Sequence, residues 1–182
     1  MKKINNLIGL SGRICSGKSF LAKKLAKDYD IQIVSFGSYL FSYSTANELP
    51  TDRNSLQDLG EQLVKNDPEN FVDNVLVHAG NINDVIIIEG IRHQVIYNIL
   101  KDISSKAIFM YVDENVNLRY KRYIDRTKEI DDKVSFNEFL QIDNHIVEQE
   151  IESLRKLYDI FITSNDTNDE LLEKVMRKFQ KD

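Results

Sequence analysis

The chain has 182 residues, of which 42% are hydrophobic and 29% are charged, a balance typical of one soluble globular domain rather than a disordered chain. Its formal net charge of -5 argues against a general affinity for nucleic acid or for an acidic membrane, and no apolar run has the length that spans a membrane. The single cysteine excludes an internal disulfide and a cysteine zinc site, so we expect a cytoplasmic protein.

The first predicted elements are a strand over the apolar run Ile4 to Leu10 and a helix from Lys18 to about Tyr29. The segment between them matches the phosphate-binding pattern G-x-x-x-x-G-K-[ST], and its residues are Gly12, Arg13, Ile14, Cys15, Ser16, Gly17, Lys18 and Ser19. Such glycines let successive backbone N–H groups point at phosphate oxygens, and the helix adds its positive N-terminal end. We expect this loop to bind ATP, Lys18 to reach the β- and γ-phosphates, and Ser19 to ligate Mg²⁺.

Two alternatives apply to this segment. The whole motif can be a glycine turn with a surface lysine, although the strand before it and the helix after it favour the phosphate loop. Oxidation of Cys15 can block nucleotide binding, although a small residue that simply fits the loop is the favoured interpretation.

The rest of the chain predicts strands that alternate with helices. The predicted strands are Ile31–Ser35, Asp84–Glu89, Ala107–Val112 and Ile160–Ile162, and the predicted helices are Gly37–Ala46, Ser55–Asn66, Asn70–Ala79, Gln94–Leu100, Asn115–Asp125, Phe136–Leu157 and Asn168–Phe179. No repeat or linker marks a second domain. This order predicts an α/β fold in which a doubly wound five-stranded parallel sheet carries helices on both faces.

The third predicted strand ends in Glu89-Gly90-Ile91-Arg92. Ligands of such sheets bind at the carboxyl ends of the strands. Glu89 is therefore expected to hold Mg²⁺, directly or through water, and Arg92 to reach a second phosphate group. The alternative for Glu89 is a capping or salt-bridged acid, but burial of such an acid without a cation is costly.

Arg119, Arg122 and Arg126 form a second basic cluster, because their spacing places them on one face of a helix. Arginines can neutralise the charge that spreads over a phosphoryl group during transfer. The charged segment Thr127 to Lys133 follows, and we expect a lid over about 119–137. The alternative is a set of solvated arginines on an ordinary helix.

The chain resembles the nucleoside monophosphate kinase group of phosphate-loop proteins, which also includes dephospho-coenzyme A kinases. Ser35 to Leu40 is similar to the segment that opens the monophosphate-binding helices, and Arg53 to Glu61, continuing through Asp67 to Val72, is similar to deoxynucleoside monophosphate kinases. The resemblance implies a helical acceptor-binding insert over about 37–80. It also implies that Arg53 grips the acceptor phosphate, that Gln57 reads the base edge, and that Ser35, Gly37 and Arg92 contact the acceptor.

The C-terminal part, from Arg119 to Asn165, resembles dephospho-coenzyme A kinases. The resemblance places Asn165, in the loop after the last strand, near the donor adenine. Two departures from the family are the shortened Glu89-Gly90-Ile91-Arg92, which lacks the usual proline, and Phe41 in place of an arginine.

Together these observations predict Mg²⁺-dependent transfer of a phosphoryl group from ATP to a nucleoside or deoxynucleoside monophosphate, with Lys18, Arg92, Arg119, Arg122 and Arg126 as catalytic residues. A dephospho-coenzyme A kinase is the first alternative, but Ser35 stands where that family commonly has an aspartate to deprotonate the acceptor hydroxyl. A switch that hydrolyses ATP slowly, without an acceptor, is the second. We expect a small-molecule nucleotide acceptor and neither a nucleic acid nor a membrane as partner, and leave the oligomeric state open.

Overall fold

The computed structural model describes residues 3–127, 134–144, 146–163, 173, 175–177 and 179. The strands are β1 (Ile4–Ser11), β2 (Gln32–Ser35), β3 (Val85–Glu89), β4 (Ser104–Val112) and β5 (Ile160–Ile162). The helices are α1 (Lys18–Tyr29), α2 (Phe36–Ala46), α3 (Arg53–Asn66), α4 (Pro68–His78), α5 (Gln94–Ile103), α6 (Val116–Thr127), α7 (Phe136–Asp143), α8 (Ile146–Leu154) and the short 3-10 helix η1 (Arg155–Leu157). Most of the helix predicted over Asn168–Phe179 lies outside the described residues.

The strands form one parallel sheet in the order β2-β3-β1-β4-β5, which confirms the predicted doubly wound fold. Alternate residues of each strand enter opposite core layers. Leu7 and Ile86 pack with α4, α5 and α8, whereas Ile8 and Ile87 pack with Leu21 and other residues of α1. Both faces of the sheet are therefore covered, which explains the uninterrupted β-branched run of β3.

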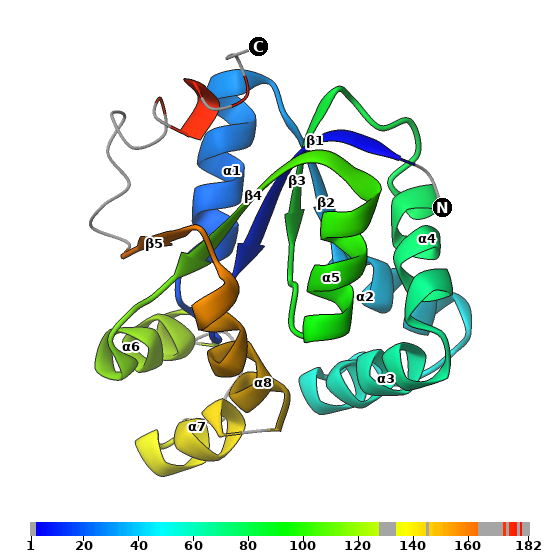
Figure 1. Ribbon diagram of the computed structural model, residues 1–182. Coiled ribbons are helices and arrows are strands. Elements are labelled where there is room, and N and C mark those ends of the chain that lie inside the picture. The colour runs from blue at the N-terminus through cyan, green and yellow to red at the C-terminus, as the bar shows by residue number, and fades with distance from the viewer. Residues whose placement is uncertain are drawn as a thin grey trace.

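The carboxyl ends of the strands meet at one edge of the sheet, where Figure 1 shows α3, α6, α7 and α8 gathered. Side-chain caps set where four of the helices begin. Ser35, Asp52, Asp67 and Ser135 cap α2, α3, α4 and α7, and each side chain accepts a backbone N–H of the first turn. Ser35 is thus both the last residue of β2 and the N-cap of α2.

The prediction of one long helix over Phe136–Leu157 is wrong. Helix α7 ends at Asp143, and α8 is a separate helix that begins at Ile146. Asp143 and Glu148 are both buried and both contact the phosphate loop. Their five-residue spacing would turn them about 140° apart on one straight helix, so the break lets both reach the same loop.

Strand β4 begins at Ser104, three residues before the predicted start, because α5 runs directly into it at Ile103. No helix among the described residues is long and apolar enough to cross a membrane.

Candidate active site

The phosphate loop joins the end of β1 to the first turn of α1, as the motif predicts. Gly12 and Gly17 have φ angles of 148° and 106°, and Gly17 is the N-cap of α1. A Cβ atom on Gly12 would lie 2.4 Å from the Val112 carbonyl oxygen and 2.7 Å from Ser16 Oγ. Only glycine fits this position, because both the space and the backbone conformation exclude a side chain.

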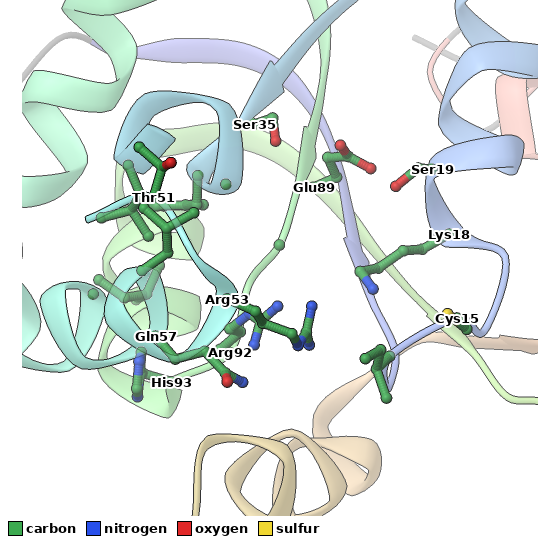
Figure 2. A pocket seen from close by; sticks show the side chains of 18 of the residues that line it. Cys15, Lys18, Ser19, Ser35, Thr51, Arg53, Gln57, Glu89, Arg92 and His93 are labelled. Atoms are coloured by element: carbon green, nitrogen blue, oxygen red, sulfur yellow. The ribbon is translucent and has the colours of Figure 1, made fainter. Parts of the chain in front are cut away.

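Lys18 lies in the wall of a cavity of about 400 Å³ that also contains Arg53 and Arg92. Burial lowers the pKa of the Lys18 ammonium to about 8, an effect that Arg92 and Arg53 strengthen and that Glu148 and Glu89 oppose. Figure 2 shows the two guanidinium groups side by side, facing Lys18 across the cavity. This concentration of positive charge favours an anionic ligand.

Ser19 and Glu89 face each other at one end of the cavity (Figure 2). Glu89 Oε2 is buried and has no hydrogen-bond partner among the described residues. A hydroxyl and a carboxylate oxygen are the donors that Mg²⁺ prefers. The residues present thus fit the Mg²⁺ ion that the phosphate-loop motif implies.

Much of the rest of the cavity wall is apolar and includes Phe36, Leu40, Leu56, Phe71 and Ile96. Gly37 also lines the cavity, and Ser35 lies beside Glu89, its register partner in the sheet (Figure 2).

Gln57 enters the cavity from α3. Its amide nitrogen and oxygen are both buried without a hydrogen-bond partner in the described part of the chain. Because unpaired buried amides are costly, this side chain is poised to bind a polar edge of a ligand.

Arg53 and Arg92, which come from α3 and the loop after β3, both donate to Glu148. Arg53 Nη2 and Arg92 Nη1 lie 3.0 Å and 3.1 Å from Glu148 Oε1. Glu148 Oε2 accepts the backbone N–H of Ile14 at 2.9 Å. The carboxylate therefore joins the phosphate loop to both predicted acceptor-binding arginines.

The three arginines of α6 all contact the phosphate loop, but in different ways. Arg119 is buried, pairs with both carboxylate oxygens of Asp143 and donates to the Ile14 carbonyl. Arg122 donates to the carbonyls of Cys15 and Ser16 and pairs with Glu114.

Arg126 lies 3.9 Å from Cys15 Sγ and lines the cavity. Arg119 and Arg122 thus brace the loop, and Arg126 is the member of the cluster that faces the ligand space.

The family of AAA domains matches residues 9–139, which is more than half of the chain. The chain belongs to the AAA domain family. The match spans the phosphate loop, Arg53, Gln57, Glu89, Arg92 and all three arginines of α6. No curated protein matches the chain significantly.

Solved structures share the fold of this AAA domain over nearly its full length. Shikimate kinase from Aquifex aeolicus vf5 has a TM-score of 0.55 and 15% identity, over 96% of both chains. A gluconokinase from Sinorhizobium meliloti 1021 has a TM-score of 0.55 and 9% identity, over 99% of this chain and 94% of its own. A Thermus thermophilus protein has a TM-score of 0.58 and 17% identity, over 98% and 97%. The domain therefore has the fold of phosphate-loop kinases.

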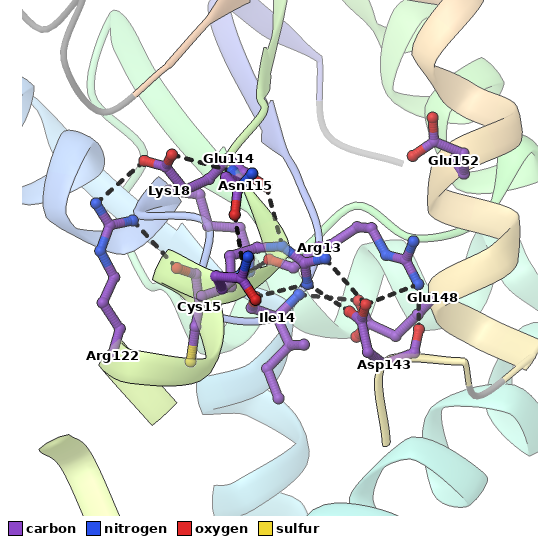
Figure 3. Close-up of polar contacts among 12 residues, drawn as sticks. Arg13, Ile14, Cys15, Lys18, Glu114, Asn115, Arg122, Asp143, Glu148 and Glu152 are labelled. Carbon is purple, nitrogen blue, oxygen red and sulfur yellow. Dashed lines mark hydrogen bonds and ion pairs between the residues drawn. The ribbon is translucent and has the colours of Figure 1, made fainter. Parts of the chain in front are cut away.

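Several residues of the AAA domain site had no predicted role. Asp143 pairs with Arg13 as well as Arg119, and Glu148 binds the loop from the next helix (Figure 3). His93 stands in the cavity wall between Glu61 and Glu150, which contact its two ring nitrogens. No local motif marks these residues, because their partners lie far away in the sequence.

Burial raises the pKa of the Cys15 thiol, although Arg126 opposes the shift. A buried thiol of this kind is inert, which supports its interpretation as a small residue that fits the loop. Asn165, His145 and residues 128–133 of the expected lid lie outside the described residues.

Proposed function

We propose that this AAA domain transfers the γ-phosphoryl group of ATP to the phosphate of a nucleoside or deoxynucleoside monophosphate. The observation that carries the proposal is the placement of Lys18 opposite Arg53 and Arg92 across one cavity. A phosphate loop on one side and two guanidiniums on the other suit two phosphate groups that must meet in line.

The apolar residues of the cavity wall support a nucleotide acceptor. A polyhydroxylated acceptor would need several hydrogen-bonding partners there, whereas the walls are largely aromatic and aliphatic. A planar base can stack between such walls and offer its polar edge to the unpaired Gln57 amide. Ser35 and Gly37 line the same cavity, where both would be near such an acceptor.

Positioning and charge neutralisation account for most of the proposed mechanism. Lys18 and the loop amides hold the donor phosphates, Arg53 and Arg92 hold the acceptor phosphate, and Arg126 neutralises charge on the transferred group. An anionic phosphate acceptor needs no general base. Mg²⁺, held by Ser19 and Glu89, would supply electrostatic stabilisation of the phosphoryl oxygens.

The unpaired Oε2 atom of Glu89 favours one second candidate, a hydroxyl acceptor such as dephospho-coenzyme A or a small hydroxy acid. Because Glu89 lies in the cavity wall, it can accept the hydroxyl proton when it does not bind Mg²⁺.

The test is ADP release from ATP and Mg²⁺ in the presence of a panel of acceptors. The panel contains the ribo- and deoxyribonucleoside monophosphates, dephospho-coenzyme A, shikimate, gluconate and a control without acceptor. Strong stimulation by one or a few monophosphates supports the proposal. Stimulation by a hydroxyl acceptor alone favours the second candidate. Slow ADP release that no acceptor changes favours a switch that hydrolyses ATP without an acceptor.

A further inference from the structure

Glu148 is a completely buried carboxylate with no predicted role, and it stands where three parts of the site meet. Its donors are the Ile14 amide of the phosphate loop, Arg53 at the start of α3, and Arg92 after β3. Burial of a carboxylate is costly unless charged partners and hydrogen bonds compensate it. Packing alone does not explain why a carboxylate is buried at this position.

The electrostatics of the cavity indicate what the carboxylate does. Lys18, Arg53 and Arg92 face one space, and their like charges repel one another. Burial lowers the pKa of Arg92, Glu148 opposes that shift, and Arg53 adds to it. Without the anion between them, the two guanidiniums would separate.

The hydrogen bonds to Glu148 leave donors for a ligand. The carboxylate contacts one terminal nitrogen of each guanidinium, and a guanidinium carries five N–H donors. Arg53 Nε is buried without a partner among the described residues. An arriving phosphate can thus bind the arginines while Glu148 still holds them.

We propose that Glu148 is a positioning residue for the phosphoryl acceptor. Its carboxylate holds Arg53 and Arg92 together and ties both to the phosphate loop, so that the acceptor phosphate meets the donor at a fixed distance and angle. This inference rests on the proposed function, because it requires an acceptor that binds the two arginines. The acceptor group that they suit is a phosphate or another oxyanion with two oxygens placed to accept bidentate hydrogen bonds from a guanidinium.

The opposite role for the same contact is inhibition, in which Glu148 imitates the phosphate and must leave before the acceptor binds. The two roles predict opposite effects of removing the charge. Loss of a positioning group weakens acceptor use, whereas loss of an inhibitory group strengthens acceptor binding.

The test compares Glu148→Gln with Glu152→Gln in the full chain, with the monophosphate that the acceptor panel selects. Glu152 lies one turn further along α8, contacts the Tyr111 hydroxyl and Arg155, and points away from the site (Figure 3). The measurements are kcat and the KM values for acceptor and for ATP, with circular dichroism and thermal unfolding as controls of folding.

We expect Glu148→Gln to lower kcat/KM for the acceptor by about tenfold to a hundredfold, as small misplacements of positioning groups do. The KM for ATP should change much less, and Glu152→Gln should match the wild type. In an Arg53→Ala background the effect of Glu148→Gln should shrink, because residues that act together are not additive.

Equal losses for acceptor and ATP, or no loss, would overturn the positioning role, and a lower acceptor KM would establish inhibition instead. If Glu148→Gln does not fold, Glu148→Asp takes its place under the same criteria, since it keeps the charge and withdraws it by one methylene. A wild-type protein without acceptor-dependent turnover would overturn the proposed function together with this inference. Normal wild-type turnover with an unaffected variant would overturn the inference alone.

Discussion

At the scale of single residues, Lys18 shows how the site changes the pKa of a side chain. Its ammonium is buried among arginines, so its charge is most stable when an anion occupies the cavity. We expect Lys18→Ala to lower kcat by about a hundredfold or more, as loss of a charged group at a phosphoryl-transfer site does. Thermal unfolding should show an intact fold. A variant with wild-type turnover would remove the phosphate loop from the mechanism.

Arg53 tests the proposed acceptor site. Because it lies on α3 and lines the cavity opposite Lys18, Arg53→Ala should raise the acceptor KM or lower kcat by about tenfold or more, with a smaller effect on ATP binding. Steady-state kinetics with each substrate varied in turn measure the difference. Arg155→Ala, which removes an exposed arginine paired with Asp113 and Glu152, is the control. Equal effects of Arg53→Ala on both ligands would contradict its assignment.

A substitution at Gly12 tests whether the backbone of the phosphate loop requires glycine. Gly12→Ala places a methyl group against the Val112 carbonyl, so we expect a loss of about 2–4 kcal/mol in the free energy of unfolding. Gly80→Ala is the matched control, because Gly80 also has a positive φ but has no atom within 4 Å of the added Cβ. Urea denaturation should show a clearly larger loss for Gly12→Ala. Similar losses would mean that backbone strain alone, rather than the close approach, requires glycine.

At the scale of elements, α7 contributes to the site through a buried ion pair. Asp143 pairs with Arg119 and with Arg13 of the phosphate loop, so Asp143→Ala leaves both arginines without this anion. We expect the free energy of unfolding to fall by about 3–5 kcal/mol.

The control for this ion pair is Asp113→Ala, which breaks a half-exposed pair with Arg155 and should cost at most about 1 kcal/mol. Denaturant unfolding compares the two variants. Similar losses would show that the Asp143 pairs are as weak as surface pairs.

The elements also show what the sequence could and could not predict. The loop between β1 and α1 was predictable because its glycines, lysine and serine are adjacent, and their local geometry is their function. The positions of the strands along the chain followed from hydrophobic runs, and their alternation with helices predicted the fold class, whereas the order of the strands within the sheet was not predicted. The break between α7 and α8 was missed because the amphipathic pattern continues through Asn144, and only the tertiary positions of Asp143 and Glu148 require two helices.

The assignments of individual side chains differ in the same way. Arg53 and Gln57 were named from a resemblance, and Glu89 and Arg92 from their place at the end of a predicted strand. The structure brings all four to one cavity. Arg119 and Arg122 were named from helical spacing, which cannot tell a ligand-facing arginine from one that binds the carbonyls and acids of its own protein. The functional roles of all these residues stay predictions until they are measured.

At the scale of the whole molecule, the parallel sheet brings distant segments to one edge. The end of β1 carries the phosphate loop, the end of β2 carries Ser35, and the end of β3 carries Glu89, with the cavity between them. Residues of α2 and α3 line one side of the cavity, and side chains of α6, α7 and α8 contact the phosphate loop. One edge of the sheet thereby combines the phosphate loop with a cavity, which is the arrangement that the proposed transfer between two small molecules requires.

The most direct test of the central proposal is the fate of the γ-phosphoryl group. The protein is incubated with Mg²⁺, ATP labelled in its γ-phosphate and the monophosphate that stimulates turnover, and the labelled product is identified. We predict label in the β-phosphate of a nucleoside diphosphate. Label in inorganic phosphate alone, or on a hydroxyl group of the acceptor, would contradict the account.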